Sequence, residues 1–206
     1  MITKSRSSKK RLIRKLKRSG KIVLSMTMSL DGFVNDRNGE VQKLYPNLAA
    51  LRKTSVLREA MQTTGAVLMG GGYDMADGDF TDYEFQVPIF VLTHDAPRKI
   101  AKGENEKLRF TFVTDGLASA VKQAKAVAGN KNVRVIGGAS ITQQMIKAGL
   151  FDELQIGIAP VLLGNGLRLF EHLSGEFELN KIREGAPLGT ATLIFFAAKQ
   201  LSPVNS

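Results

Sequence analysis

The sequence predicts an α/β protein with a buried, mostly parallel central sheet and an antiparallel edge near its C-terminal end. Three observations support this fold class. Short apolar runs, typical of strands buried on both faces, alternate with segments whose apolar residues follow a helical spacing. Several of these runs end in glycine pairs or triplets. The last part of the chain carries only strand patterns, and their closeness in sequence favours an edge hairpin.

The first half of the body alternates between the two kinds of pattern. A strand is predicted over residues 21–28 (KIVLSMTM), which are rich in apolar residues. A helical spread of apolar positions follows Pro46 and covers residues 47–62. Three strand patterns come next, at residues 65–72, 87–93 and 109–114.

The second half continues this alternation and then changes character. A helix is predicted over residues 116–128, and a strand over 132–138 ends in two glycines. A second helix is predicted over residues 139–148. The remaining strand patterns cover residues 152–164, 176–185 and 189–199. We therefore expect a single domain over residues 21–206.

The net charge of +10 belongs to the N-terminal segment rather than to the body. Residues 1–20 contain nine Lys or Arg and no acid, whereas residues 21–206 contain 20 basic and 19 acidic residues. A DNA-binding domain usually carries its basic face on the fold itself, so that class is disfavoured. We expect residues 1–20 to be a basic, disordered tail. An organellar transit peptide, or a tail that binds nucleic acid or anionic lipid, stays open.

Composition excludes several kinds of site. The chain has no cysteine, which rules out disulfides, zinc–thiolate sites and thiol nucleophiles. With only His94 and His172 present, we expect no metal site. No apolar run approaches the ~20 residues that span a bilayer. We expect a cytoplasmic protein, or an organellar one if residues 1–20 are a transit peptide.

Unusual residues gather where the predicted strands end. In an open α/β sheet, ligands bind beyond the carboxyl ends of the strands. The motifs at such ends are MSLDG (28–32), GGG (70–72), Thr93 with His94, GGAS (137–140) and PVLLGNG (160–166).

The GGAS motif points to a phosphate-bearing ligand. Two glycines between a strand and a helix let the backbone approach a ligand, and the N–H groups at the helix start then face it. A tight turn without a ligand is the alternative, and the second cluster at 70–72 strengthens the cofactor interpretation. The sequence has no G-x-G-x-x-G with a following acid, no P-loop and no G-x-S-x-G, which disfavours Rossmann dehydrogenases, P-loop NTPases and α/β-hydrolases.

Asp31 is the candidate catalytic residue. It is an acid at the end of a strand in an apolar context, where it could orient a substrate or relay a proton through water. The alternative is a polar residue that simply ends the strand.

Five sequence segments together carry a family resemblance. They are SMTMSLDGFV (25–34), AVLMG (66–70), VPIFVLTHDAP (87–97), the long stretch from VRVIGGAS to GNGLRLF (133–170), and TLIFFA near the end. In order and spacing they resemble the reductase (C-terminal) domain of the bifunctional riboflavin-biosynthesis enzyme, in the dihydrofolate-reductase-like superfamily. The resemblance extends over nearly all of residues 21–199.

The resemblance implies a fold and an activity. The fold is a dihydrofolate-reductase-like three-layer sandwich, usually in a homodimer. The activity is NADPH-dependent reduction, which in the riboflavin enzymes acts on 5-amino-6-(5-phosphoribosylamino)uracil. The deaminase half of those enzymes has a zinc site that needs cysteines, and this chain has none. We therefore expect a stand-alone reductase of a small heterocyclic or pyrimidine-type substrate.

The resemblance also implies which residues form the site. The implied cofactor-binding residues are Gly70, Gly71, Gly72, Thr93, His94, Gly137, Gly138, Ala139 and Ser140. The implied substrate-side residues are Ser29, Asp31, Pro160, Leu163, Gly164 and Gly166. One departure concerns the residue after Gly70, where the family often has an Arg that could contact a phosphate and this chain has Gly71. The choice between NADPH and NADH therefore stays open.

Three alternatives remain at this point. One is a folate-type reductase, which the motifs do not separate from a pyrimidine reductase. Another is a non-catalytic nucleotide-binding protein, which the missing Arg makes credible. The third is a nucleic-acid-associated protein that acts through its basic tail.

Overall fold

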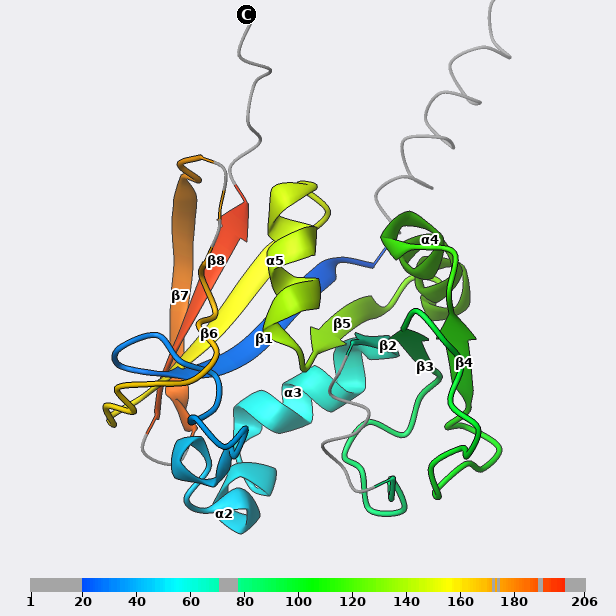
Figure 1. Cartoon of the computed structure of the whole chain (residues 1–206), viewed down its shortest axis with the longest axis horizontal. Helices are drawn as coiled ribbons and strands as arrows, with labels where there is room; N and C mark the ends of the chain where they lie inside the picture. The colour runs from blue at the N-terminus through cyan, green and yellow to red at the C-terminus, as the bar shows by residue number, and fades with distance from the viewer. Residues whose placement is uncertain (1–19, 71–77, 172, 174, 189–190, 199–206) are drawn as a thin grey trace, which may run out of the picture.

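A computed structural model describes residues 20–70, 78–171, 173, 175–188 and 191–198 of the chain (Figure 1). The predicted tail up to residue 19, Gly71, Gly72 and His172 lie outside the described residues. The strands are β1 (Ile22–Ser29), β2 (Thr64–Met69), β3 (Ile89–Leu92), β4 (Phe110–Val113), β5 (Asn132–Ile136), β6 (Glu153–Ala159), β7 (Leu179–Leu188) and β8 (Ala191–Ala198). The helices are η1 (Gln42–Leu44), α2 (Leu48–Arg52), α3 (Ser55–Thr63), α4 (Leu117–Ala128) and α5 (Ala139–Lys147).

The strands form one sheet in the order β4-β3-β2-β5-β1-β6-β8-β7. All neighbours from β4 across to β6 are parallel, and β8 pairs antiparallel with both β6 and β7. The predicted α/β class, with a mostly parallel sheet and an antiparallel C-terminal edge, is confirmed. The crossover helices cover the faces of the sheet, which explains why the parallel strands read as continuous apolar runs.

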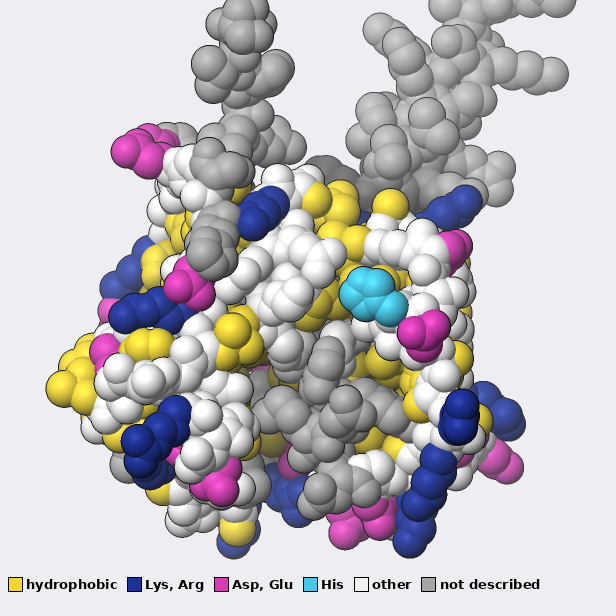
Figure 2. Space-filling model, in the orientation of Figure 1, with side chains coloured by type: hydrophobic (Ala, Val, Ile, Leu, Met, Phe, Trp, Pro, Cys, Tyr) yellow, Lys and Arg dark blue, Asp and Glu magenta, His cyan; other side chains and the backbone are white. Residues whose placement is uncertain are grey.

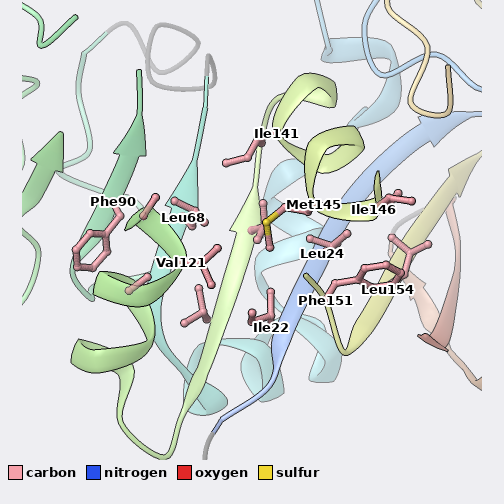
Figure 3. Close-up of a cluster of buried hydrophobic side chains, with 14 of the residues drawn as sticks. Ile22, Leu24, Leu68, Phe90, Val121, Ile141, Met145, Ile146, Phe151 and Leu154 are labelled. Atoms are coloured by element: carbon pink, nitrogen blue, oxygen red, sulfur yellow. The ribbon is translucent and has the colours of Figure 1, made fainter. Parts of the chain in front are cut away.

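The alternation of side chains along β1 assigns its residues to two different layers. Leu24 lies beside Val135 of β5 and Leu154 of β6, and all three belong to the core cluster that also holds Met145 of α5 (Figure 3). Ser25 points to the opposite face, because successive residues of a strand alternate. On that face α3 and the segment before it cover polar as well as apolar side chains.

Several predicted elements are wrong in their boundaries. The single helix predicted over 47–62 is two helices, because Thr54 leaves helical geometry and its Oγ1 accepts a hydrogen bond from the Leu57 N–H at 3.2 Å as the N-cap of α3. The strand predicted over 152–164 ends at Ala159. Pro160 follows and has no N–H to donate to a neighbouring strand.

The strand predicted over residues 132–138 also extended too far into the glycines that follow it. β5 ends at Ile136, because Gly137 and Gly138 take positive φ angles that leave the strand conformation. The C-terminal strand predicted over 176–185 instead covers Leu179–Leu188.

The core position of Leu24 leads to a stability prediction. Leu24→Ala should lower the free energy of unfolding by about 2–5 kcal/mol, because it removes a fully buried side chain from the central strand. The matched control is Leu30→Ala, since Leu30 is 65% exposed and its truncation should change stability by no more than about 0.5 kcal/mol. Denaturant unfolding measures both, and equal losses would contradict the assignment of Leu24 to the core.

Candidate functional site

A cavity of about 250 Å³ opens where β1 and β5 approach their carboxyl ends. This is the edge at which the sequence placed the site. Its walls come from both of these strands, the turn after β5, the segment before η1 and the segment after residue 78. The lining residues are Ser25, Met26, Thr27, Val34, Asn35, Val41, Tyr45, Met69, Phe80, Tyr83, Ile136, Gly137, Gly138, Ala139 and Leu167.

The glycine turn forms one wall of this cavity. Gly137 and Gly138 have φ angles of 79° and 84°, which residues other than glycine rarely adopt. Gly138 is the N-cap of α5 and provides no side-chain cap, so the N–H groups at the start of the helix receive no side-chain partner there. A helix start of this kind suits an anion such as a phosphate. Ala139, the first residue of α5, is fully buried.

Two tyrosines that were not predicted from the sequence, Tyr45 and Tyr83, line the cavity. Burial raises the pKa of Tyr45, and a hydrogen bond with Thr27 partly offsets that rise. Tyr83 carries a buried hydroxyl that has no hydrogen-bond partner among the described residues, and burial raises its pKa as well. Both hydroxyls therefore keep their protons at neutral pH. Neither residue lies in a periodic pattern, so no signal in the sequence marked them.

Asp31 accepts three hydrogen bonds from groups close to it. Its Oδ1 accepts from the Ser29 hydroxyl at 2.5 Å and from the Leu163 N–H at 3.1 Å. Its Oδ2 accepts from the Gly164 N–H at 2.8 Å. These bonds, the one from Ser29 first, lower the pKa of Asp31 from 3.8 to about 2 against a smaller opposing effect of desolvation. The carboxylate is therefore ionised at neutral pH.

The Asp31 bonds join the turn after β1 to the loop after β6. The Leu30 N–H donates to the Val161 carbonyl at 2.9 Å, which adds a backbone link between the same two segments. Four of the predicted substrate-side residues, Ser29, Asp31, Leu163 and Gly164, are thus brought together. Asp31 itself does not line the cavity, and its predicted contact with a substrate stays a prediction.

The residues next to this linkage do reach the cavity. Asn35 Oδ1 accepts a hydrogen bond from the Leu167 N–H at 2.8 Å, and both residues form part of the wall. Gly166 has a φ of 136°, and a Cβ there would lie 2.0 Å from the Asn35 carbonyl oxygen. Only glycine allows the two segments to come this close. Pro160, at the start of the loop, is exposed.

Gly70, Thr93, His94 and Ser140, also predicted to bind the cofactor, lie near the same sheet edge but outside the cavity lining. A Cβ on Gly70 would lie 3.5 Å from Ile141 in the first turn of α5. Thr93 donates its hydroxyl to the Asp95 carbonyl at 2.8 Å, and His94 is exposed. Ser140 is exposed on α5. Their predicted contacts with a cofactor stay predictions.

Three further observations concern metal binding, membrane-spanning helices and surface charge in the described part of the chain. Within it, no group of three or more His, Asp or Glu side chains could hold a metal ion, and none of its helices is long and apolar enough to cross a membrane. On the face shown in Figure 2, Lys and Arg side chains are scattered among Asp and Glu instead of gathering into one basic patch.

Two known proteins resemble this chain, one in sequence and the other in both sequence and structure. The uncharacterized protein YyaP of Bacillus subtilis (strain 168) is 25% identical over 166 residues, which cover 79% of this chain and 86% of YyaP. A candidate riboflavin biosynthesis protein of Shewanella sp. PV-4 superposes with a TM-score of 0.71 at 24% identity, over 87% of this chain and 99% of that one.

Two enzymes of known structure have the same fold. One is a diaminohydroxyphosphoribosylaminopyrimidine deaminase/5-amino-6-(5-phosphoribosylamino)uracil reductase of Thermotoga maritima, with a TM-score of 0.67 and 14% identity. This alignment covers 89% of the present chain but only 58% of the Thermotoga protein. The other is dihydrofolate reductase of Enterococcus faecalis, solved with NADP(H), with a TM-score of 0.60 and 13% identity over 88% of this chain and 98% of that one.

The family assignment rests on most of the body of the chain. Residues 20–187 match the RibD C-terminal domain family, a span that contains every element from β1 to the end of the α/β alternation and most of β7. The superposition on the Thermotoga protein, with its TM-score of 0.67, agrees with that match. This chain is a member of the RibD C-terminal domain family.

Proposed function

We propose that this protein is an NAD(P)H-dependent reductase of a small heterocyclic, pyrimidine-type substrate. The observation that carries the proposal is the Gly137–Gly138 turn, which lies beside the cavity at the carboxyl ends of the parallel strands and leads into the uncapped start of α5. Membership of the RibD C-terminal domain family supports it. So do two proteins of the same fold, the Thermotoga reductase and the Enterococcus dihydrofolate reductase solved with NADP(H).

The residues around the turn fit a dinucleotide. The N–H groups at the start of α5 would bind a phosphate, and the missing side chains of Gly137 and Gly138 would let the backbone approach it. The Tyr83 hydroxyl, which lacks a partner among the described residues, would gain one from a ligand in the cavity. A reduced nicotinamide supplies a hydride when it is bound.

The protein residues would orient the substrate, exclude water and supply a proton. The apolar side chains of Met26, Val34 and Ile136 would exclude water from the cavity. The Tyr45 hydroxyl lies in the wall beside Thr27, where it could donate a hydrogen bond to the substrate. Burial raises the pKa of Tyr45, so it would give up its proton only to the strong base that hydride transfer creates on the substrate. Asp31 is ionised and so is a poor proton donor.

Asp31 would act on the substrate side by positioning. Its bonds to Leu163 and Gly164 hold the loop that leads to Leu167 in the cavity wall. Asp31→Asn would weaken these bonds and should raise KM more than it lowers kcat. Unchanged kcat and KM on the true substrate would contradict a substrate-side role. The homodimer that the family resemblance implies belongs to the same proposal, and light scattering tests it. The cytoplasmic location expected from the sequence is tested by localisation.

Cofactor binding is the first test of the proposed function. NADPH at about 100 times its Kd should add about 2.7 kcal/mol to the free energy of unfolding, because it binds the folded state alone. Thermal unfolding with NADPH, NADH and FMN in parallel measures this and ranks the cofactors. If no nucleotide raises the unfolding temperature, the reductase proposal fails.

The glycine turn gives a second, more local test. Gly138→Ala should cost about 1–3 kcal/mol of stability, because alanine is strained at a φ of 84°, and it should weaken NADPH binding by about tenfold or more. Gly129→Ala is the matched control, since Gly129 also has a positive φ of 62° but lies at the far end of α4. The control should lose stability and keep the Kd for NADPH, measured by calorimetry. Equal losses of affinity in both variants would argue against a cofactor site at the turn.

The lowered pKa of Asp31 predicts a pH dependence. Its hydrogen bonds favour the ionised form in the folded state, so their contribution to stability is complete above the unfolded pKa of 3.8 and is lost as the pH falls through about 2. The difference in Tm between the wild type and Asp31→Asn should therefore be constant above about pH 5 and shrink between about pH 4 and pH 2. Thermal unfolding across this range measures it. A difference that stays constant down to pH 2 would refute the linkage.

A further inference from the structure

A second cavity adjoins the one beside the glycine turn. It has a volume of about 160 Å³ and shares Ser25, Met26, Thr27, Tyr45 and Ile136 with the first. Its other walls are mostly apolar and come from α2, α3, Phe85 and Leu193. Arg134, in the middle of β5, is the charged side chain among its lining residues.

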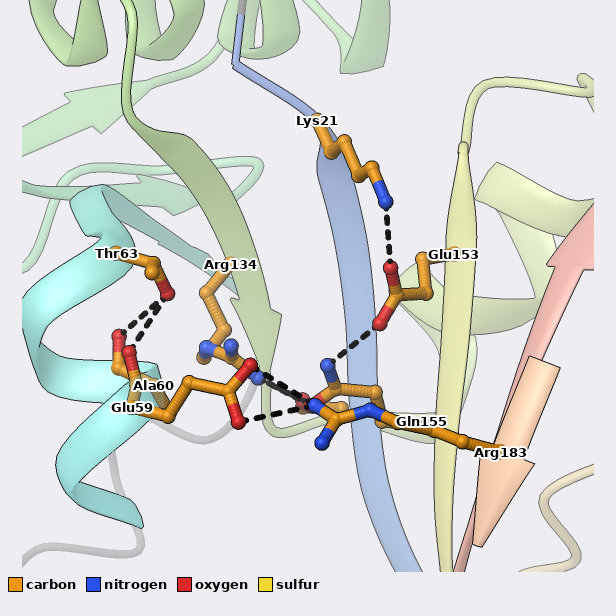
Figure 4. Close-up of polar contacts among 9 residues, drawn as sticks. Lys21, Glu59, Ala60, Thr63, Arg134, Glu153, Gln155 and Arg183 are labelled. Atoms are coloured by element: carbon orange, nitrogen blue, oxygen red, sulfur yellow. Dashed lines mark hydrogen bonds and ion pairs between the residues drawn. The ribbon is translucent and has the colours of Figure 1, made fainter. Parts of the chain in front are cut away.

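Arg134 is a buried cation whose hydrogen-bond partners are neutral. The residue is 4% exposed. Its Nη1 donates to Gln155 Oε1 at 2.7 Å (Figure 4). Nη1 also donates to the Ser25 hydroxyl, and its Nε donates to the Thr64 hydroxyl at 3.2 Å. Its Nη2 donates to no group among the described residues. Buried charges are normally paired with an opposite charge, so this arrangement needs an explanation.

The nearby carboxylates are bound by other groups. Glu153 accepts from Lys21 at 3.1 Å and from Gln155 Nε2 at 2.9 Å. Glu59 accepts from Arg183 Nη2 through both oxygens, at 2.9 and 3.0 Å (Figure 4). Two acids therefore face three cations, Lys21, Arg183 and Arg134. Among the residues that the structure describes, no carboxylate contacts Arg134 directly. Burial lowers the pKa of Arg134 to about 10, so it stays charged at neutral pH.

The neighbours of Arg134 do not depend on it for their own hydrogen bonds. Ser25 donates to Gln155 Oε1 at 3.1 Å, and Gln155 donates to Glu153. The Thr64 hydroxyl donates to the Ala60 carbonyl at 2.7 Å. Removal of Arg134 would leave each of these donors satisfied. Replacing a whole buried ion network by apolar side chains of similar volume is often neutral or stabilising, so stability alone does not require an arginine at the centre of this one.

We infer that Arg134 binds an anionic oxygen group, a carboxylate or a phosphate, carried by the substrate of this enzyme. The substrate would then extend between the two cavities, with a flat ring facing the cofactor near Gly137 and an anionic substituent in the second cavity. The apolar walls suit the ring, and the Nη2 group suits the anion, because hydrogen bonds between oppositely charged groups are shorter and stronger than those between neutral groups. The identification of this ligand as the substrate rests on the proposed reductase function.

A pair of probes that differ only in charge tests the inference. Benzoate and its neutral analogue benzamide have the same ring and nearly the same shape. Calorimetry or ligand-observed NMR should show that the wild type prefers benzoate by about tenfold or more, as expected for a hydrogen bond to a buried charged group. Arg134→Met should abolish this preference, and Arg134→Lys should retain part of it.

Arg183→Met is the matched control. Arg183 lines a neighbouring polar cavity of about 260 Å³ together with Arg134, but it is paired with Glu59 and lies 3.9 Å above the Phe195 ring. This variant should keep the wild-type preference for benzoate. If Arg134→Met does not fold, the double variant Arg134→Met/Glu153→Gln removes both charges and takes its place.

Each outcome separates the inference from the function on which it rests. Equal binding of benzoate and benzamide by the wild type overturns the inference, as does a preference that survives in Arg134→Met. NADPH binding, measured in the same samples, tests the reductase function separately. An Arg134-dependent preference in a protein that binds no NADPH would establish the anion site while it overturned the reductase assignment.

Discussion

The parallel pairing of β1 with both β5 and β6 is the constraint on which the rest of the structure depends. Its register places Leu24 beside Val135 and Leu154 on one face, and Ser25 beside Ile136 and Gln155 on the other. A shift of one residue would exchange the two faces and bury the polar set in the core. One strand therefore supplies both the centre of the hydrophobic core and the floor of the cavity. Core and site cannot vary independently of each other.

In the turn after β1, one acidic residue, Asp31, holds a neighbouring loop in place beside the site. Asp31 binds the Ser29 hydroxyl and two backbone N–H groups of the 160–166 loop, and each of these bonds favours its ionised form. The loop has little regular structure of its own, so these contacts define where it lies. The approach of Gly166 to Asn35 completes the same junction. An acid at a strand end can thus shape a pocket wall without touching what the pocket holds.

The two faces of the sheet differ in the polar side chains that they bury. The α5 face is closed by apolar side chains, as a core requires. The α3 face buries Arg134, Thr64, Glu153 and Gln155 in a connected network. Such a network in a low-dielectric interior is costly unless every charge finds a partner. This difference is the physical reason for assigning the α3 face to ligand binding.

Much of the fold could be read from the sequence, and the site only in part. Buried parallel strands have to be apolar on both faces, so the strands and the helices over 117–128 and 139–147 could be recognised from composition and spacing. Positive φ angles demand glycine, so the turn at Gly137 and Gly138 was recognisable too. The break between α2 and α3 was missed because Thr54 caps a helix through a local hydrogen bond that periodicity does not register.

Tertiary structure alone decided what these residues face. Asp31 is joined to Leu163 and Gly164 across more than 130 residues of sequence, and no local pattern announces such a contact. Tyr45, Tyr83 and Arg134 reach the cavities only because the sheet order brings β1 and β5 together beneath α3. The sequence by itself determined the fold class and the glycine turn, since both follow from local conformational preference and burial. The partners of each polar group depend on which strands become neighbours, and that is a property of the folded chain.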